Sequence, residues 1–389
     1  MKIAIISRND IYDIRSWSGT DNNLFRALKK AVSLRGGSLC VVDKLTKKRN
    51  ILVRIFYTYS RKLLLKLFRY IFVDDFYRVF VKYYARQIKR ELPNDVDIIF
   101  SMTSWPITYL KSDKIKVFYS DADIGDFLES SDFKKLSKYR KKSAIRMRGD
   151  AINNSDLVLL ASEWAVNGTL NRYNISDVGK VKLVPFGANT ECNRTKEDIA
   201  KIIKNKEKEK CNLLFIGVDW DRKGGNIALE TAKILHKNGM NVYLDIVGIK
   251  NCPVELPEYV INHGFISKST ENGRRKIDSL YEKAHFFILP TRFDCYGIVF
   301  CEASSFGLPS LAPRTGGVSS VILDGKNGKL FDLVEGGEVY AEYIRAMFID
   351  YENYKRLCFS SFEQYETRLN WGVAAEKILD SIWEVYSKK

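Results

Sequence analysis

The sequence has few residues of the kinds that hold metal ions or form disulfide frameworks. Its three histidines, His236, His263 and His285, are scattered and show no spacing typical of metal ligands. The seven cysteines are odd in number, and none of them stands in a CxxC motif. This usage predicts reduced thiols in a cytoplasmic protein and argues against a disulfide framework or a zinc site.

Long apolar stretches are also missing. No run of about 18 apolar residues occurs, so we expect no helix that spans a membrane. Met1 and Lys2 lead directly into an apolar strand, which predicts that no signal peptide is present. Apolar residues still make up 46% of the 389 residues, enough for sizeable cores, and the length predicts two or three domains.

Acidic residues are scarce in parts of the N-terminal half. The net charge is +16, and residues 44–91 hold 14 basic and 3 acidic residues, while residues 132–148 hold 8 and 1. Within 61–90, basic side chains recur at helical spacing beside aromatic ones: Lys62, Lys66, Arg69, Arg78, Lys82, Arg86 and Lys89, with Phe76, Phe80, Tyr83 and Tyr84. This composition is typical of helices that dock on anionic membrane surfaces. The alternative is two ordinary domain helices with a solvated basic face. The sequence contains no nucleic-acid-binding motif, so we expect no nucleic acid partner.

Short apolar runs alternate with helical patterns along the whole chain. In the first half the predicted strands are 2–6, 39–42, 95–101, 116–120, the strand within 155–164 that ends before Ser162, and the strand within 181–189; in the second half they are 212–217, 243–248, 262–267 and 286–289. Continuous apolar strands separated by helices predict parallel sheets in Rossmann-like, doubly wound domains. Gly19 precedes a helix predicted over 21–34 and is either a ligand-loop glycine or a simple turn residue. No GxGxxG fingerprint is present.

The stretch 291–309, TRFDCYGIVFCEASSFGLP, carries the strongest functional pattern. A predicted strand, a loop and a helix that begins near Tyr296 would point the amides of Gly297, Ile298 and Val299 at an anion. Asp294 and Glu302 stand eight residues apart, so the two acids could contact opposite ends of an elongated ligand whose phosphate lies between them. The alternative is a helix-capping Asp294 and a solvated Glu302.

Asp294-x7-Glu302, with YGIVF between the acids and EA…GLP after them, resembles the Glu-x7-Glu signature of retaining glycosyltransferases, and more closely glycosyltransferase family 4. The resemblance implies a GT-B fold: two Rossmann-like doubly wound α/β domains that face a cleft. It implies that Asp294 contacts the donor sugar, that Glu302 binds the ribose, and that Tyr296, Gly297, Ile298 and Val299 hold the diphosphate of a nucleotide-sugar donor. Here the first acid is Asp and not Glu.

The segment VDWDRKGGN, residues 218–226, also resembles this family. Two cations at a helix start suit a diphosphate leaving group, because negative charge accumulates there as the glycosidic bond breaks. The resemblance assigns this catalytic role to Lys223 and, with Val218 standing where the family has Arg, to Arg222. The alternative is a solvated basic loop. Further substrate contacts implied by the resemblance or by strand ends are Gly19, Asp121 and Gly187.

Together these features predict an N-terminal acceptor-side domain at 1–190, a charged linker at 191–210 and a nucleotide-sugar-binding domain at 211–370. A final helix at 371–389 should pack back on the first domain. The implied activity is retaining transfer of a hexosyl-type sugar to a hydroxyl acceptor, in bacterial surface polysaccharide or lipid-linked glycan synthesis, without a metal or other cofactor. We expect a cytoplasmic enzyme, peripheral on the inner membrane face if the basic helices dock there. The alternatives are a nucleotide-sugar epimerase of the same fold and an inactive glycosyltransferase-like subunit.

Overall fold

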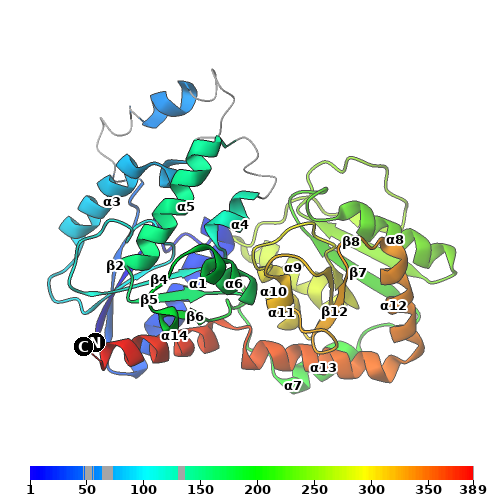
Figure 1. The fold of residues 1–389 in the computed structure, drawn as a ribbon. Coiled ribbons are helices and arrows are strands. Elements are labelled where there is room, and N and C mark those ends of the chain that lie inside the picture. Colours follow the sequence, from blue (N-terminus) through cyan, green and yellow to red (C-terminus); the bar gives the residue numbers. More distant parts are fainter. Residues whose placement is uncertain (47, 49–54, 56, 64–72, 130–135, 389) are drawn as a thin grey trace. The chain divides into compact units, whose positions relative to one another are not determined.

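The computed structural model describes the chain apart from residues 47, 49–54, 56, 64–72, 130–135 and 389. The described chain divides into two compact units: Met1–Pro185 together with Ala374–Lys389, and Phe186–Val373. Both are α/β units built on a parallel sheet (Figure 1). We call them the first and the second unit and describe each by itself.

The first unit is built on a sheet that, in the described part of the chain, has six strands in the order β2-β1-β3-β4-β5-β6. Every pair of neighbouring strands is parallel. The strands are β1 (Lys2–Ile6), β2 (Ser38–Val42), β3 (Ile98–Ser101), β4 (Ile115–Ser120), β5 (Leu157–Leu160) and β6 (Val181–Leu183). The strand order reverses between β1 and β3, so the loops that follow these two strands diverge at the same edge of the sheet.

Helices cover both faces of this sheet. They are α1 (Thr20–Leu34), α3 (Arg78–Glu91), α4 (Ile124–Glu129), α5 (Lys138–Asn153), α6 (Glu163–Arg172) and the C-terminal α14 (Trp371–Tyr386). Ala4 and Ile6 belong to the core cluster that includes α3 and α5, and the alternate residues Ile3 and Ile5 are buried as well. Because side chains alternate between the two faces of a strand, both faces of β1 are covered, as the continuous apolar run predicts.

The C-terminal helix α14 packs against the first unit through ion pairs at its acidic face. Lys182, on β6, pairs with Glu384, and Arg35, at the end of α1, pairs with Glu376 and lies 2.8 Å from Asp380. Figure 1 shows α14 on the side of the sheet opposite α3 and α5.

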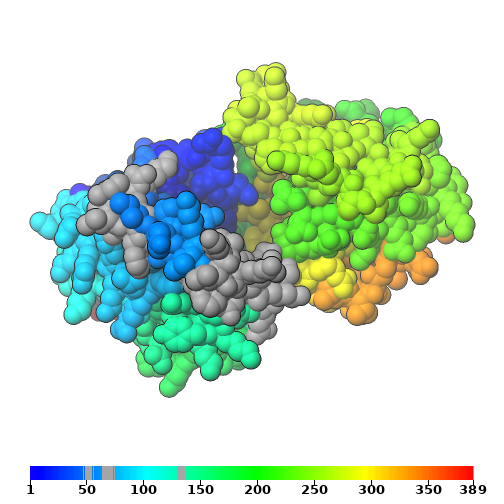
Figure 2. Space-filling view, turned by 90° about the horizontal axis from the view of Figure 1, so that it is seen from above, coloured from blue at the N-terminus to red at the C-terminus, as the bar shows by residue number. Residues whose placement is uncertain are grey.

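Helix α3 shows the arrangement of an ordinary domain helix. Phe80 and Tyr84 are buried in the core cluster together with Val81 and Ile88. The basic stripe Arg78, Lys82, Arg86 and Lys89 is exposed. Figure 2 shows the surface of this part of the chain in light blue and cyan. The expectation of aromatic edges at a membrane interface is therefore wrong for Phe80 and Tyr84, because both rings are needed in the core; the expected Lys66 and Arg69 lie outside the described residues.

The second unit contains a parallel sheet with, in the part of the chain that the structure describes, six strands in the order β12-β11-β10-β7-β8-β9. The strands are β7 (Cys211–Ile216), β8 (Val242–Val247), β9 (Val260–Asn262), β10 (Phe286–Ile288), β11 (Ser310–Pro313) and β12 (Gly328–Phe331). Here the order reverses between β7 and β10. The loops after these strands carry Lys223 and Asp294.

The helices of the second unit are α7 (Lys196–Lys204), α8 (Gly225–Lys237), α9 (Glu271–Lys283), α10 (Ile298–Ser304), α11 (Val318–Val321), α12 (Gly337–Ile349) and α13 (Tyr351–Thr367). Residues 191–210, for which the sequence predicts a linker, include α7. Thr195 and Asp198 form a capping box at its start, and Ile199 and Ile203 are buried. This segment is therefore a packed part of the second unit.

The two ends of the second unit meet around Gly187. The backbone amide of Ala188 donates to Leu369 O at 2.9 Å, and Trp371 Nε1 donates to Asn189 Oδ1 at 2.9 Å. A Cβ on Gly187 would lie 2.2 Å from the backbone nitrogen of Trp371. A side chain is therefore excluded at this position by backbone packing.

We predict that Gly187→Ala destabilises the protein by about 1–3 kcal/mol, because the new methyl group must displace backbone atoms. The matched control is Gly239→Ala, where φ is +81° and nothing lies within 4 Å of the added Cβ; it should cost about 1–2 kcal/mol from backbone strain alone. Thermal unfolding of both variants tests this. A smaller loss for Gly187→Ala than for Gly239→Ala would contradict the close approach.

Candidate functional site

The loop between β7 and α8 positions Arg222 and Lys223. Gly224, with φ +75°, ends this loop as the N-cap of α8, and the amide of Lys223 donates to Asp219 O at 3.0 Å. A Cβ on Gly224 would lie 2.0 Å from Pro290 O, so the loop lies directly against the loop that follows β10. This contact brings two segments together that are separated by about 70 residues in the sequence.

Lys223 Nζ and the Asp294 carboxylate form an ion pair across these two loops. Both side chains are largely buried, with 13% and 16% of their surfaces exposed. Asp294 is further fixed because its carbonyl accepts a hydrogen bond from the Gly317 amide at 3.1 Å. Asp294 is not a helix cap: the N-cap of α10 is Gly297. The predicted cation and the predicted first acid therefore lie in contact at the point where the strand order reverses.

Arg222 connects the same two loops. Its Nη1 donates to Phe293 O at 3.3 Å, and its own carbonyl accepts from the Arg292 amide at 2.7 Å and from Thr291 Oγ1 at 3.2 Å. Its side chain thus braces the loop that carries Asp294. Val218, which stands where the resembled family has Arg, is 69% exposed.

The first turn of α10 presents backbone amides at the same edge of the sheet. The helix begins at Ile298, two residues later than expected, after Gly297 with φ +86°. A Cβ on Gly297 would lie 2.6 Å from the Phe300 ring, which restricts this position to glycine. Among the described residues, no acceptor forms a hydrogen bond with the backbone amides of Gly297, Ile298 or Val299.

Tyr296 differs from the expectation in the direction of its side chain. Its ring packs against Phe186, with centroids 5.4 Å apart, and its hydroxyl donates to Phe186 O at 2.9 Å. Only 3% of the residue is exposed. Its hydroxyl is thus part of the core of the second unit.

Glu302 is a buried acid with two partners. Only 1% of the residue is exposed, so the alternative of a solvated helix carboxylate is wrong. Oε1 lies 2.5 Å from Lys268 Nζ, and Oε2 accepts from the Tyr281 hydroxyl at 3.0 Å. Burial and the neighbouring carboxylate raise the pKa of Tyr281, so its hydroxyl stays protonated and remains a donor.

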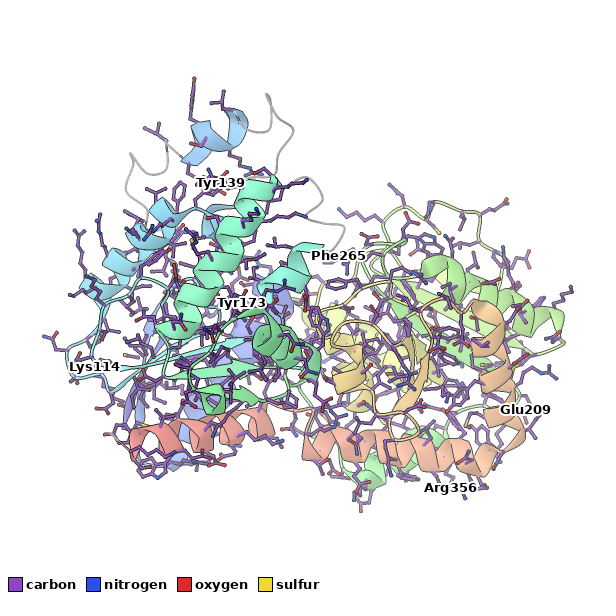
Figure 3. The ribbon with its side chains drawn as sticks, in the orientation of Figure 1. Lys114, Tyr139, Tyr173, Glu209, Phe265 and Arg356 are labelled. Atoms are coloured by element: carbon purple, nitrogen blue, oxygen red, sulfur yellow. The ribbon has the colours of Figure 1, made fainter. Side chains whose placement is uncertain are left out.

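Lys268 is a site residue that the sequence pattern did not reveal. It lies in the loop between β9 and α9, a loop that also carries the exposed Phe265 (Figure 3). Its side chain is 34% exposed, so its ammonium group can turn away from Glu302 into solvent. The signal that could have identified it is a lysine in the loop that follows a strand at the carboxyl edge of the sheet.

Of the remaining predicted residues, Gly19 and Asp121 lie in the first unit, in loops at the carboxyl edge of its sheet, and Gly187 does not. Gly19 has φ +90° and follows Trp17 and Ser18, which also have positive φ values of 45° and 55°. Asp121 follows β4 and lines a cavity that is described below. Gly187 belongs to the second unit and packs against Trp371.

Two absences can be stated for the residues that the structure describes. Among them, no group of three or more His, Cys, Asp or Glu side chains has the arrangement of a metal site. No helix in the described ranges has the length and apolar character needed to cross a membrane.

Solved structures that this chain resembles over its whole length include glycosyltransferases and a sucrose-phosphate synthase. Sucrose-phosphate synthase from Thermosynechococcus elongatus covers all of this chain, with all of its own chain covered, at a TM-score of 0.70 and 16% identity. HepE from Anabaena, in complex with UDP-glucose, covers 99% of this chain and is itself fully covered, at a TM-score of 0.61 and 14% identity. The prediction of a GT-B fold with two doubly wound units is confirmed; the cleft between the units stays a prediction.

Sequence comparison finds a family match for part of the chain. Residues 195–358 match glycosyl transferases group 1. An uncharacterised 41.2 kDa protein from the cps region of Klebsiella pneumoniae is 24% identical over 209 residues, which is 52% of this chain and 55% of that protein. The chain spans about half or less of the length of the curated relatives that it matches. The predicted family is thereby confirmed as glycosyl transferases group 1 for residues 195–358, and the narrower assignment to family 4 stays a prediction.

The pairing of Glu302 gives a testable prediction. Lys268→Met should lower the free energy of unfolding by about 1–3 kcal/mol, because it leaves a buried carboxylate with a single hydrogen-bond donor. Adding Glu302→Gln should recover part of that loss, since the charge is then removed. Urea unfolding of the two single variants and the double variant measures the coupling.

The matched control is Lys283→Met, an exposed lysine at the end of α9. It should change stability by less than about 0.5 kcal/mol. Strict additivity of Lys268→Met and Glu302→Gln would show that the two side chains do not interact in solution.

Proposed function

We propose that the protein is a retaining glycosyltransferase that moves a sugar from a nucleotide-diphosphate sugar to a hydroxyl acceptor in surface polysaccharide or lipid-linked glycan synthesis. The observation that carries the proposal is the contact between Lys223 and Asp294, together with the amides of Gly297–Val299, which have no acceptor among the described residues, inside the segment that matches glycosyl transferases group 1. The comparison with a protein of a cps region supports the polysaccharide context. The UDP-glucose complex of HepE supports a nucleotide-sugar donor, and UDP-sugars are the first donors to test.

In this proposal the donor extends along the carboxyl edge of the second sheet. Asp294 accepts hydrogen bonds from the transferred sugar, and Lys223 together with the amides of Gly297, Ile298 and Val299 binds the diphosphate. Because Lys223 and Asp294 are in contact, the bond between sugar and phosphate lies next to the cation. Glu302 binds the ribose, and Lys268 shifts toward solvent to admit it.

The chemistry follows from positioning and electrostatics. The bond between the anomeric carbon and the phosphate oxygen breaks, the acceptor oxygen forms a bond to the same face of that carbon, and a donor phosphate oxygen takes the acceptor proton. The negative charge that develops on the diphosphate is stabilised by Lys223 and the backbone amides. No metal is part of the proposal. Arg222 contributes by holding the loop of Asp294 in place.

A transfer assay distinguishes this proposal from its alternatives. A panel of nucleotide sugars is first screened by thermal shift, since a ligand at 100 times its dissociation constant adds about 2.7 kcal/mol of stability. The stabilising donor is then incubated with acceptor extracts, and products are analysed by NMR. A glycoside of retained configuration supports transfer, an altered free sugar nucleotide indicates an epimerase, and no turnover with any bound donor indicates an inactive subunit.

We predict that Lys223→Ala lowers turnover about 10²- to 10³-fold, because a charge that stabilises the leaving group is lost. Its melting temperature should fall as well, because the largely buried Asp294 carboxylate loses its cation, so turnover is compared per folded protein. Lys237→Ala, an exposed lysine at the end of α8, is the control and should keep full turnover. Normal turnover of folded Lys223→Ala would exclude the leaving-group role.

We also propose that the exposed basic residues of the first unit dock the enzyme on the anionic cytoplasmic face of a membrane, where a lipid-linked acceptor would be found. Each lysine or arginine near such a surface contributes about 1 kcal/mol. Co-sedimentation with vesicles containing phosphatidylglycerol should exceed that with phosphatidylcholine alone, and salt should reduce it.

The variants are matched in charge. Changing Lys62, Lys82, Arg86 and Lys89 to Glu should abolish co-sedimentation. Changing four exposed lysines of the second unit, Lys201, Lys204, Lys208 and Lys237, to Glu should leave most of it. Equal loss in both quadruple variants would mean that only net charge matters, and no binding by the unchanged protein at low salt would refute docking.

A further inference from the structure

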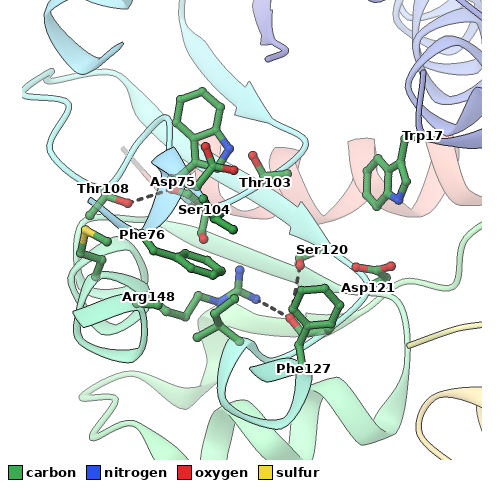
Figure 4. Close-up of a pocket in the computed structure, with 16 residues that line it drawn as sticks. Trp17, Asp75, Phe76, Thr103, Ser104, Thr108, Ser120, Asp121, Phe127 and Arg148 are labelled. Atoms are coloured by element: carbon green, nitrogen blue, oxygen red, sulfur yellow. Dashed lines mark hydrogen bonds between the residues drawn. The ribbon is translucent and has the colours of Figure 1, made fainter. Parts of the chain in front are cut away.

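The first unit contains a cavity of about 330 Å3 that the donor-binding residues do not explain (Figure 4). It lies at the carboxyl ends of β1, β3 and β4, next to the point where the strand order of the first sheet reverses. Ligands of open α/β sheets bind at such a place. The volume is close to the lower limit of about 300 Å3 for small-molecule sites, so it suits one sugar-sized unit better than a long chain.

The wall of the cavity combines rings with hydroxyl groups. The rings belong to Trp17, Phe76, Trp105 and Phe127, and the hydroxyls to Thr103, Ser104, Thr108 and Ser120. Flat apolar surfaces next to hydrogen-bonding groups fit a sugar ring, which has apolar C–H faces and a polar rim.

Arg148 is a charged residue on the cavity wall whose guanidinium is incompletely hydrogen-bonded. Only 5% of this residue is exposed. Its Nη2 donates to Ala122 O at 3.0 Å, and its guanidinium lies 4.6 Å from the centroid of the Phe118 ring. Nε is buried without a hydrogen-bond partner. Among the residues that the structure describes, no carboxylate forms an ion pair with this guanidinium.

The neighbouring acids do not take that role. Asp123 is bound by Arg172, with Nε 2.7 Å from Oδ2, and by the amide of Gly125 at 2.9 Å. Asp121 and Trp17 lie at the other end of the cavity from Arg148 in the view of Figure 4. Asp75, also on the wall, pairs with Arg8 at 2.6 Å.

Burial of this guanidinium is costly, because it has lost its water and its direct contacts are one neutral acceptor and one ring face, while the charges of Asp123 and Asp121 act on it without an ion pair. Burial lowers the pKa of Arg148 from its ordinary value, in keeping with this incomplete compensation. Arginine still keeps its proton, so its planar fork is available for a bidentate oxyanion.

We propose that this cavity binds a sugar that carries an oxyanion, a carboxylate or a phosphate, with Arg148 as the cation that selects it. Calling this ligand the acceptor rests on the proposed function. In that role its anionic group contacts Arg148, its ring lies against the aromatic wall, and a hydroxyl faces Asp121. Neutral sugars of the same size bind weakly because they leave Arg148 unpaired.

The test measures binding of D-glucuronate, D-glucose 6-phosphate, D-glucose and inorganic phosphate to the whole protein by calorimetry and ligand-observed NMR. One of the two anionic sugars should bind about 10- to 100-fold more tightly than glucose, as expected for a charge-assisted hydrogen-bonded pair. Tighter binding of D-glucuronate identifies the anion as a carboxylate, and tighter binding of D-glucose 6-phosphate identifies it as a phosphate. Equal affinities for the anionic sugars and glucose would overturn the role of Arg148, and inorganic phosphate binding as tightly as the sugar phosphate would overturn the sugar.

Arg148→Met removes the charge and keeps most of the volume. It should lose the preference for the anionic sugar and keep or raise the melting temperature, since an unpaired buried charge disappears. Arg148→Lys keeps the charge without the planar fork and should show intermediate affinity, which preserves the test if the Met variant fails to fold. Arg146→Met, an exposed arginine on the same helix α5, is the control for charge. Tight binding that survives in Arg148→Met would refute the proposal.

A donor-site variant separates this inference from the proposed function. Lys223→Ala should weaken nucleotide-sugar binding and leave glucuronate or glucose 6-phosphate binding unchanged, while Arg148→Met should do the reverse. If no nucleotide sugar binds to the unchanged protein, the proposed function fails, and the anion preference of the cavity is still measured on its own.

Discussion

The parallel arrangement of both sheets is the constraint on which the rest of this structure depends. Parallel strands need a crossover between each pair, so every strand in a sheet ends at the same edge, and the loops at that edge come from distant parts of the chain. In the second unit this rule brings Lys223 against Asp294, although the two are 71 residues apart. In the first unit it gathers Trp17, Thr103 and Asp121 around one cavity. In each unit, the topology alone thus gathers loops at one edge of the sheet, whichever side chains those loops carry.

Buried charge distinguishes the two sites. In the second unit, Glu302 is bound by Lys268 and Tyr281, and Asp294 is bound by Lys223. Both carboxylates therefore have partners in the absence of a ligand. In the proposed function, a nucleotide-sugar donor would replace some of these partners with its own groups. In the first unit, Arg148 contacts a neutral carbonyl and a ring, and no acid among the described residues forms an ion pair with it. Burying an uncompensated charge opposes folding, which makes a ligand anion the natural completion of that site.

The sequence predicts the strands well because a strand covered on both faces must be apolar throughout, and such runs are visible without knowledge of their neighbours. It predicts Asp294 and Lys223 because each stands in a local motif. It misses Lys268 because the partner that defines its role, Glu302, is 34 residues away. The orientation of Tyr296 depends on a carbonyl 110 residues away, and the need for glycine at 187 depends on the backbone of Trp371. Pairings of this kind follow from the folded structure and leave no local pattern.

The departure at Val218 changes how the leaving group would be stabilised. The resembled family has an arginine at this position, whereas Val218 exposes 69% of its surface and carries no charge. Arg222 Nη1 donates to Phe293 O at 3.3 Å, and the direct replacement of that arginine by Arg222 stays a prediction. Lys223 is then the principal cation of this loop, and the shorter Asp294 in place of Glu keeps the carboxylate in contact with it. In the proposed function the two departures are coupled, because the acid and the amides of Gly297–Val299 would hold the sugar and diphosphate around Lys223.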